Sequence, residues 1–186
     1  MSRQHYLKAG EVAFSKMDKV SAELLALTYG SLVTQLLKDK EEIESVNVQL
    51  EKMGYNIGIR LVDEFLAKSG IGPCQDFRDT AEVIAKVALK MFLNVTADVT
   101  GWNSDLTACT LVLHDNPLNE FVELPASMAG LKYGELICGV IRGGLEQVHM
   151  RVSCTFVKDV LKGDDTSEIA LEFKEILKEE FVDEDE

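Results

Sequence analysis

The sequence predicts an α+β fold, because helical and strand periodicities occupy different parts of the chain. Apolar residues recur at helical spacing before residue 94, and an alternating period follows. The chain has 186 residues, of which 46% are hydrophobic and 27% charged, as is typical of one globular domain. We therefore expect four main helices flanking a mainly antiparallel sheet, with the last helix inserted between strands.

The chain divides into three predicted segments. Residues 1–18 mix Lys, Gln, His and Gly without periodicity and are interpreted as a flexible arm. Residues 19–176 are expected to form the single domain. Residues 177–186 form an acidic tail, whose charge run is typical of a solvated segment and ends in Asp183, Glu184, Asp185 and Glu186.

Three helices are predicted in the first half of the domain. Ser21 is the expected N-cap of the first, which extends through the leucines up to residue 37. The second spans residues 44–67, where Gly54 and Gly58 indicate a close crossing by another helix of the chain or by another subunit. A Gly/Pro segment ends it, and Asp76 caps a third helix that runs to about Leu93.

The second half predicts strands around one more helix. Residues 106–114 alternate with apolar residues on both faces, as expected for a strand that is buried on both sides or lies at an interface. Residues 121–125 are interpreted as a short irregular or edge strand, and residues 131–148 as the fourth helix. Residues 151–158 and 167–175 form a hairpin with its turn at 162–165.

Charge and composition exclude several classes of function. A formal net charge of -13 disfavours nucleic acid as a partner. The chain shows no hydrophobic run of signal-peptide length and none of about 18 residues, so a cytosolic protein is expected. Its widely spaced cysteines are interpreted as free thiols: Cys74, Cys109, Cys138 and Cys154.

Motifs for catalysis and metal binding are missing from the sequence. It contains no Cys-x-x-Cys, His-x-x-x-His, P-loop, nucleophile elbow or dinucleotide-binding glycine pattern. The histidines are isolated, and Asp164-Asp165 fits a hairpin turn better than a cation site. No metal and no catalytic residue are therefore predicted.

Cys74 is the candidate functional residue. It precedes a predicted helix N-terminus, where the helix dipole favours a thiolate that attacks an activated acyl group. Ala81, Ala85 and Ala88 give the following helix a thin face, which leaves room for a straight hydrocarbon. The alternative is that Cys74 is a small buried hydrophobic residue.

Several segments resemble the small-subunit family of the transport protein particle (TRAPP), and within it the branch of subunit three. The resemblance covers about residues 20–175 without large gaps. It is carried by these runs: Leu27-Thr28-Tyr29-Gly30-Ser31-Leu32, Met53-Gly54-Tyr55-Asn56-Ile57-Gly58, Asp76-Phe77-Arg78-Asp79-Thr80-Ala81, Asn116-Pro117-Leu118, Phe121-Val122-Glu123-Leu124-Pro125 and Cys138-Gly139-Val140-Ile141-Arg142-Gly143.

The resemblance implies an α/β plait that works as a non-catalytic subunit of a vesicle-tethering complex. That complex promotes nucleotide exchange on a Rab-type GTPase in transport from the endoplasmic reticulum (ER) to the Golgi. The implied partners are related TRAPP small subunits, a second copy when the chain is alone, and the GTPase. The implied location is cytoplasmic, peripheral at early Golgi and ER membranes.

The resemblance also implies a covalent palmitate on Cys74 and no other cofactor. The acyl chain is expected in an internal apolar channel lined by Ala81, Ile84, Ala85, Ala88 and Met91. The tail residues Asp183, Glu184, Asp185 and Glu186 are expected to contact the GTPase. Pro73 departs from the family pattern, in which a basic residue is expected beside the cysteine.

Two other functions compete with a scaffold subunit. One is an acyl-thioester transferase or hydrolase that uses Cys74, although the sequence offers no base beside this residue. The other is a module that binds lipid reversibly in the same channel.

Overall fold

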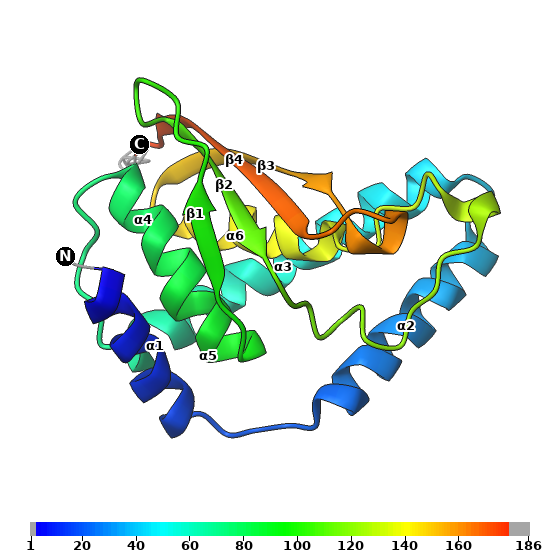
Figure 1. The fold of residues 1–186 in the computed structure, drawn as a ribbon, viewed down its shortest axis with the longest axis horizontal. Helices are drawn as coiled ribbons and strands as arrows, with labels where there is room; N and C mark the ends of the chain where they lie inside the picture. The colour runs from blue at the N-terminus through cyan, green and yellow to red at the C-terminus, as the bar shows by residue number, and fades with distance from the viewer. Residues whose placement is uncertain (1–2, 179–186) are drawn as a thin grey trace, which may run out of the picture.

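The second half of the chain forms a four-stranded antiparallel sheet in the order β1-β2-β4-β3 (Figure 1). The computed structural model describes residues 3–178. Its strands are β1 (Ala97–Thr100), β2 (Ala108–Leu113), β3 (Met150–Lys158) and β4 (Ser167–Ile176). The predicted α+β class is confirmed, including the hairpin, although β1 was not expected from the sequence.

The sheet buries one face. Cys109, Leu111 and Leu113 of β2 lie in the core, together with Ile169 and Leu171 of β4. The intervening residues of β2 are only half-buried. The expectation that this strand is buried on both sides is therefore wrong within the described chain, and the other face of the sheet stays partly open.

Two of the predicted helices begin directly after their predicted N-cap residues. Ser21 accepts a hydrogen bond from the Leu24 amide at 3.2 Å and starts α2 (Ala22–Asp39). Asp76 does the same for the Asp79 amide at 2.8 Å and starts α4 (Phe77–Val83). The other predicted helices are α3 (Ile43–Lys68) and α6 (Glu135–Gln147).

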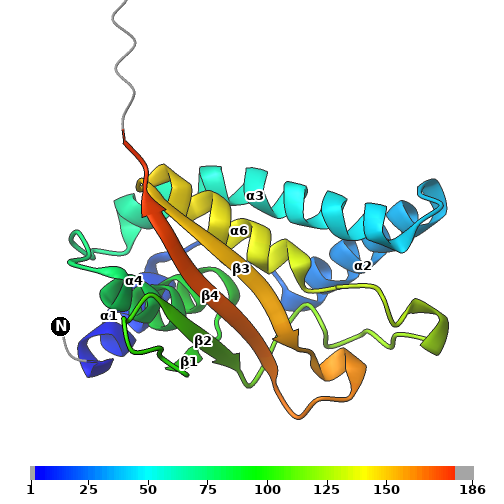
Figure 2. The same ribbon diagram turned by 90° about the horizontal axis from the view of Figure 1, so that it is seen from above.

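Glycines let α3 and α6 touch through their backbones. A Cβ atom built on Gly54 would lie 2.0 Å from the Leu136 carbonyl oxygen, and one on Gly139 would lie 2.1 Å from the Glu51 oxygen. Figure 2 shows α6 between β3 and α3. Of the two interpretations of Gly54 and Gly58, the structure therefore supports helix packing within the chain.

The third predicted helix contains a π turn. α4 passes into the π-helical segment η1 (Ile84–Ala88) and then into α5 (Leu89–Leu93). The Leu89 amide donates to the Ile84 carbonyl, five residues earlier. A π turn changes which residues share a helix face, and no residue pattern in the sequence indicates it.

The interpretation of residues 1–18 as a flexible arm is wrong for residues 3–16. They form α1 (Arg3–Lys16), which lies along α4, η1 and α5 (Figure 1). Tyr6, Gly10 and Ala13 are buried, and a Cβ on Gly10 would lie 2.2 Å from the Lys86 carbonyl oxygen. Two of these contact residues are so small that they leave no apolar period in the sequence.

A buried lysine ties η1 to the sheet and to α1. Lys86 is 2% exposed and donates to the Ala97 carbonyl oxygen and, at 2.8 Å, to Asp98 Oδ1. Asp98 also pairs with Arg3 of α1. The Lys86 ammonium is the main cause that lowers the pKa of Asp98.

The remaining segments are irregular or short. Residues 121–125 contain no regular strand, in contrast to one of the interpretations of this segment. Short 3₁₀ helices span Ala126–Met128 (η2) and Val160–Lys162 (η3), the latter within the connection from β3 to β4. Most of the predicted acidic tail lies outside the described residues.

Candidate functional site

Cys74 lies on the loop that joins α3 to α4. The loop begins after Ser69 with Gly70, whose φ of +68 lies in the left-handed region that favours glycine. Pro73 prevents the helix from continuing. The local sequence thus places Cys74 just before the first turn of α4, where the sequence predicts it.

The first turn of α4 is held by hydrogen bonds around Asp76 and Asp79. The Thr80 hydroxyl donates to the Asp76 carbonyl oxygen at 2.9 Å. The Tyr6 hydroxyl, from α1, donates to Asp79 Oδ1 at 2.9 Å and is the main cause that lowers the pKa of Asp79. The loop that carries Cys74 is therefore fixed by α1 as well as by its own cap.

The Cys74 thiol is free, and its residue is exposed. Partial burial of the sulfur raises its pKa, and the charges of Asp79 and Asp76 raise it further. A hydrogen bond with Thr80 acts in the opposite direction. Burial of the sulfur therefore outweighs the hydrogen bond with Thr80, and the expected effect of the helix dipole on the thiolate stays a prediction.

The predicted channel residues follow Cys74 along one continuous helical segment. Ala81 and Ala85 are 0% exposed, and both belong to the main core with Ile84. Met91 is also buried, whereas Ala88 is half-buried. The structure thus brings three of the five residues into one cluster beside the sheet, and the channel itself stays a prediction.

Two cavities described in the structure lie elsewhere. Their volumes are about 470 and 230 Å³, and neither is lined by Cys74 or by a predicted channel residue. The larger opens beside the loop that follows β2, at Asn116 and Asn119. The sequence predicts no functional site in that loop, although Asn116-Pro117-Leu118 is one of the runs that carry the family resemblance.

The remaining predicted site residues are not described. Asp183, Glu184, Asp185 and Glu186 lie outside residues 3–178. Within that range, no group of three or more His, Cys, Asp or Glu side chains is arranged to hold a metal ion. No helix between residues 3 and 178 has both the length and the apolar character needed to cross a membrane.

Contacts between α1 and the cysteine loop escaped the sequence-based prediction. The Tyr6 to Asp79 hydrogen bond joins residues 73 positions apart, so no local spacing indicates it. The spacing of Tyr6, Gly10 and Ala13 by four and three residues is a helical signal. Detecting it requires glycine and alanine to be counted as contact residues.

Comparison with known proteins shows similarity along nearly the whole chain. Residues 25–172 match the model of a family described as transport protein particle (TRAPP) component. "Trafficking protein particle complex subunit 3" of Dictyostelium discoideum is 56% identical over 175 residues, which cover 94% of each chain. "Transport protein particle subunit bet3" of Schizosaccharomyces pombe is 51% identical over 180 residues, covering 96% of this chain and 98% of that protein.

A solved structure is similar in fold as well as in sequence. It is the crystal structure of a trafficking protein particle complex subunit 3 from Naegleria fowleri covalently bound to palmitic acid. The two structures superimpose with a TM-score of 0.83 at 56% identity, covering 87% of this chain and 100% of the other.

Proposed function

This chain belongs to the transport protein particle (TRAPP) component family, and we propose that it is a non-catalytic core subunit of a vesicle-tethering complex. The complex promotes nucleotide exchange on a Rab-type GTPase in transport from the ER to the Golgi. The subunit acts in the cytoplasm at early Golgi and ER membranes. Relatives named as trafficking complex subunits support this proposal.

The placement of Cys74 carries the proposal of a bound acyl chain. Its thiol is free and exposed, and the helix that follows presents the small buried side chains of Ala81 and Ala85 to the core. The palmitic acid held covalently by the Naegleria fowleri protein supports the same modification here. Cys74 carries the palmitate, and Ala81, Ile84, Ala85, Ala88 and Met91 line its channel.

Acylation of Cys74 is a thioester exchange. The Cys74 thiolate attacks the carbonyl carbon of an acyl-coenzyme A, a new sulfur–carbon bond forms, and the coenzyme A thiolate leaves and takes up the proton. The raised pKa of Cys74 keeps the thiolate scarce at neutral pH, so acylation is expected to be slow. Burial of some fourteen methylenes of the acyl chain stabilises the fold by on the order of 10 kcal/mol at most. Because the acyl chain lies inside the protein, it does not act as a membrane anchor.

Intact mass spectrometry under non-reducing conditions tests the acylation. We expect the purified protein to gain one fatty-acyl increment on incubation with palmitoyl-coenzyme A, and to lose it in neutral hydroxylamine. Cys74→Ser should gain none, whereas Cys109→Ser, which removes a buried thiol, should behave as the unmodified sequence does. Release of many coenzyme A molecules per protein would favour the acyl-transferase or hydrolase instead.

Helix-mediated assembly follows from the surface of α2. Leu24 and Leu27, which belong to the leucines of this predicted helix, are 63% and 58% exposed. Such exposure is typical of a contact surface. The related TRAPP small subunits, or a second copy of this chain, cover this surface.

The acidic tail is the part of the chain proposed to reach the GTPase. Asp183, Glu184, Asp185 and Glu186 repel nucleotide phosphates and compete for the basic residues and Mg²⁺ that hold them. Nucleotide release is then favoured.

A further inference from the structure

Three aromatic rings pack together beside the start of α4, directly after Cys74. Phe77 belongs to the first turn of α4, Trp102 to the connection from β1 to β2, and Phe173 to β4. Figure 1 shows these three segments at the same end of the sheet. The ring centre of Phe77 lies 5.9 Å from that of Trp102 and 5.8 Å from that of Phe173. We call these three residues the aromatic cluster.

Phe77 stands between Cys74 and the residues of the predicted channel. Ala81 follows Phe77 one helical turn later, which places both side chains on one face of α4. Both belong to the main core together with Ala85, and Phe77 is only 7% exposed. A hydrocarbon chain bonded to the Cys74 sulfur therefore has to pass the Phe77 ring before it reaches Ala81.

The aromatic cluster leaves no width for such a chain. Carbon atoms in contact lie about 3.5 to 4.0 Å apart, so a methylene chain between two rings needs roughly 7 to 8 Å. The rings of Phe77 and Trp102 meet edge to face, with 83° between their planes, and those of Phe77 and Phe173 are tilted by 39°. Both centre distances are typical of packed aromatic pairs. Entry of the chain therefore requires that at least one of these two ring contacts opens.

Trp102 is the ring of the cluster that is held least. Phe77 lies in a helical turn that the Asp76 side chain caps. Phe173 is fixed through its backbone, because its amide donates to the Thr107 carbonyl oxygen at 2.7 Å and its strand pairs with β3. Trp102, in contrast, is half-buried in a connection whose other residues are mostly exposed.

The backbone on both sides of Trp102 is anchored. Asn103 Oδ1 accepts hydrogen bonds from the Thr107 and Ala108 amides at 2.9 and 3.0 Å. On the other side, Thr100 of β1 pairs with Thr110 of β2. Movement of Trp102 is therefore a rotation of its side chain toward solvent, while the connection itself stays in place.

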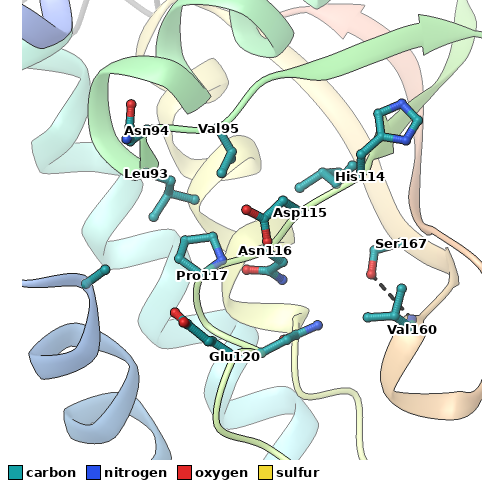
Figure 3. A pocket seen from close by; sticks show the side chains of 13 residues that line it. Leu93, Asn94, Val95, His114, Asp115, Asn116, Pro117, Glu120, Val160 and Ser167 are labelled. Atoms are coloured by element: carbon teal, nitrogen blue, oxygen red, sulfur yellow. Dashed lines mark hydrogen bonds between the residues drawn. The ribbon is translucent and has the colours of Figure 1, made fainter.

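The larger cavity gives the acyl chain no other way in. It opens at the end of α5 and beside Asn116 (Figure 3). None of its lining residues belongs to α4, to the loop that carries Cys74 or to the aromatic cluster. The route from Cys74 to Ala81 thus depends on the aromatic cluster.

We propose that Trp102 is the gate of the acyl channel. Its indole rotates away from Phe77, the Phe77 ring shifts into the space that is left, and the chain passes from Cys74 toward Ala81. The chain passes before the thioester exchange, since its burial then holds the donor carbonyl beside the Cys74 sulfur. Short acyl groups need no open gate, so Trp102 affects the rate for long-chain donors only. This inference rests on the proposed acylation of Cys74.

The fluorescence of Trp102 reports its movement directly, because it is the only tryptophan of the chain. Hexadecyl and methyl methanethiosulfonate place a long or a short group on Cys74 without an acyl donor. The Cys74 thiolate attacks the sulfenyl sulfur, a disulfide bond forms, and methanesulfinate leaves. The other three cysteines are buried, and the Cys74→Ser variant controls for effects of the reagents elsewhere.

We expect the hexadecyl group to shift the emission to longer wavelength and to increase quenching by acrylamide, since the indole becomes exposed. The methyl group should change neither. Intact mass confirms that one group is attached to each chain. An unchanged emission with the hexadecyl group, or a shift to shorter wavelength, would overturn the gate, because Trp102 would then have stayed in place or become more buried.

Acylation rates of variants test the role of Trp102 in passage. Trp102→Ala should react with palmitoyl-coenzyme A roughly twofold to tenfold faster than the unmodified sequence, as expected for the loss of one aromatic contact. Its rate with acetyl-coenzyme A should not change. Trp102→Phe keeps a ring in the cluster and should show the same contrast with a smaller difference. Phe121→Ala removes an exposed ring outside the cluster and should leave both rates unchanged.

The outcomes separate the gate from the acylation itself. If palmitoyl-coenzyme A leaves Cys74 unmodified while the hexadecyl group moves Trp102, the gate stands and the proposed acylation fails. If Cys74 is acylated but Trp102→Ala accelerates both donors equally, or neither, Trp102 has no role in passage and the gate is refuted.

Discussion

Glu135 begins α6 with a carboxylate that the fold removes from water. The residue is 8% exposed, and one of its oxygens, Oε2, has no hydrogen-bond partner in the described chain. Burial is the main cause that raises its pKa. The folded state therefore holds a proton on this group more tightly than the unfolded state does.

We predict that Glu135→Gln stabilises the protein at neutral pH. A group with a raised folded pKa contributes stability below its unfolded pKa and loses it as the pH rises through the folded value. Glutamine does not titrate, so the variant should gain about 1 kcal/mol of unfolding free energy at pH 7. The difference should shrink below about pH 4, near the unfolded pKa of a glutamate.

Denaturant unfolding at several pH values measures this difference. Glu123→Gln, an exposed residue, serves as the control and should show no such dependence. If the variant is less stable at pH 7, the Glu135 carboxylate must interact favourably with the N-terminus of α6, and by more than its desolvation costs.

Adjacent glycines of α6 differ sharply in what they permit. A Cβ on Gly143 would lie 2.2 Å from the Tyr55 carbonyl oxygen, which is backbone and cannot move away alone. A Cβ on Gly144 would lie 3.6 Å from the Gly58 oxygen, an ordinary contact. Substitution by alanine at these two positions therefore separates two effects. At Gly143 the added Cβ disturbs the packing of α6 on α3, and at Gly144 it only reduces the flexibility of the backbone.

We predict that Gly143→Ala destabilises the fold by on the order of 3 kcal/mol, because α3 and α6 must move apart. Gly144→Ala should be neutral or stabilising by up to about 1 kcal/mol, since alanine favours a helix more than glycine does. Chemical denaturation of both variants measures the contrast. Similar stabilities would mean that the helices separate at little cost.

The channel proposed along η1 and α5 needs a small side chain at Ala88. Ala88→Leu should lower the fraction of protein that acquires a fatty-acyl mass, because the longer side chain fills space that the chain needs. Ala108→Leu, an equally half-buried position on β2, is the control and should be acylated normally. Full acylation of the Ala88→Leu variant would show that this helix does not line the channel.

The sequence predicts elements well where apolar residues repeat over many turns. α2, α3 and α6 have long apolar stripes. Ser21 marks the start of α2 and Asp76 the start of α4, each through a local hydrogen bond. α1 escaped because its contacts use Gly10 and Ala13. β1 escaped because it has four residues, of which Ala97 alone is buried.

The sequence likewise predicts only part of the candidate site. The place of Cys74 follows from the glycines, Pro73 and Asp76, all of which act within a few residues. The raised pKa of Cys74 does not follow, because it depends on how much water the folded chain leaves around the sulfur. The cavity at Asn116 depends on contacts between α5, β2 and β4, which no spacing in the sequence reports.

In the complete fold, α2 extends away from the sheet (Figure 1). Its apolar side chains Leu24 and Leu27 are exposed. We predict a dimer at micromolar concentration in sedimentation velocity. Leu24→Glu combined with Leu27→Glu should give a monomer, because burial of added carboxylates opposes association. Val157→Glu on β3, where the valine is 55% exposed, should leave the dimer intact. A monomeric unmodified protein would contradict this assembly.

The acidic tail is expected to act only in the assembled complex. Removal of the residues after Val182 should leave dimerisation and complex assembly unchanged while nucleotide exchange on the GTPase becomes slower. Exchange measured with a fluorescent nucleotide, on complexes of equal composition, gives the comparison. An unchanged rate would leave Asp183, Glu184, Asp185 and Glu186 as solvated charge.

The strand order has a consequence for how the chain leaves the ribosome. β4 is the last strand of residues 3–178, yet it lies between β2 and β3 and pairs with both. Until β4 has been synthesised, no strand links β2 to β3, and the edge of each that β4 will cover is open to pairing with other chains. The sheet is therefore complete only after Ser167–Ile176 has been translated, and we expect a nascent chain that stalls before residue 167 to be a substrate for chaperones or proteases.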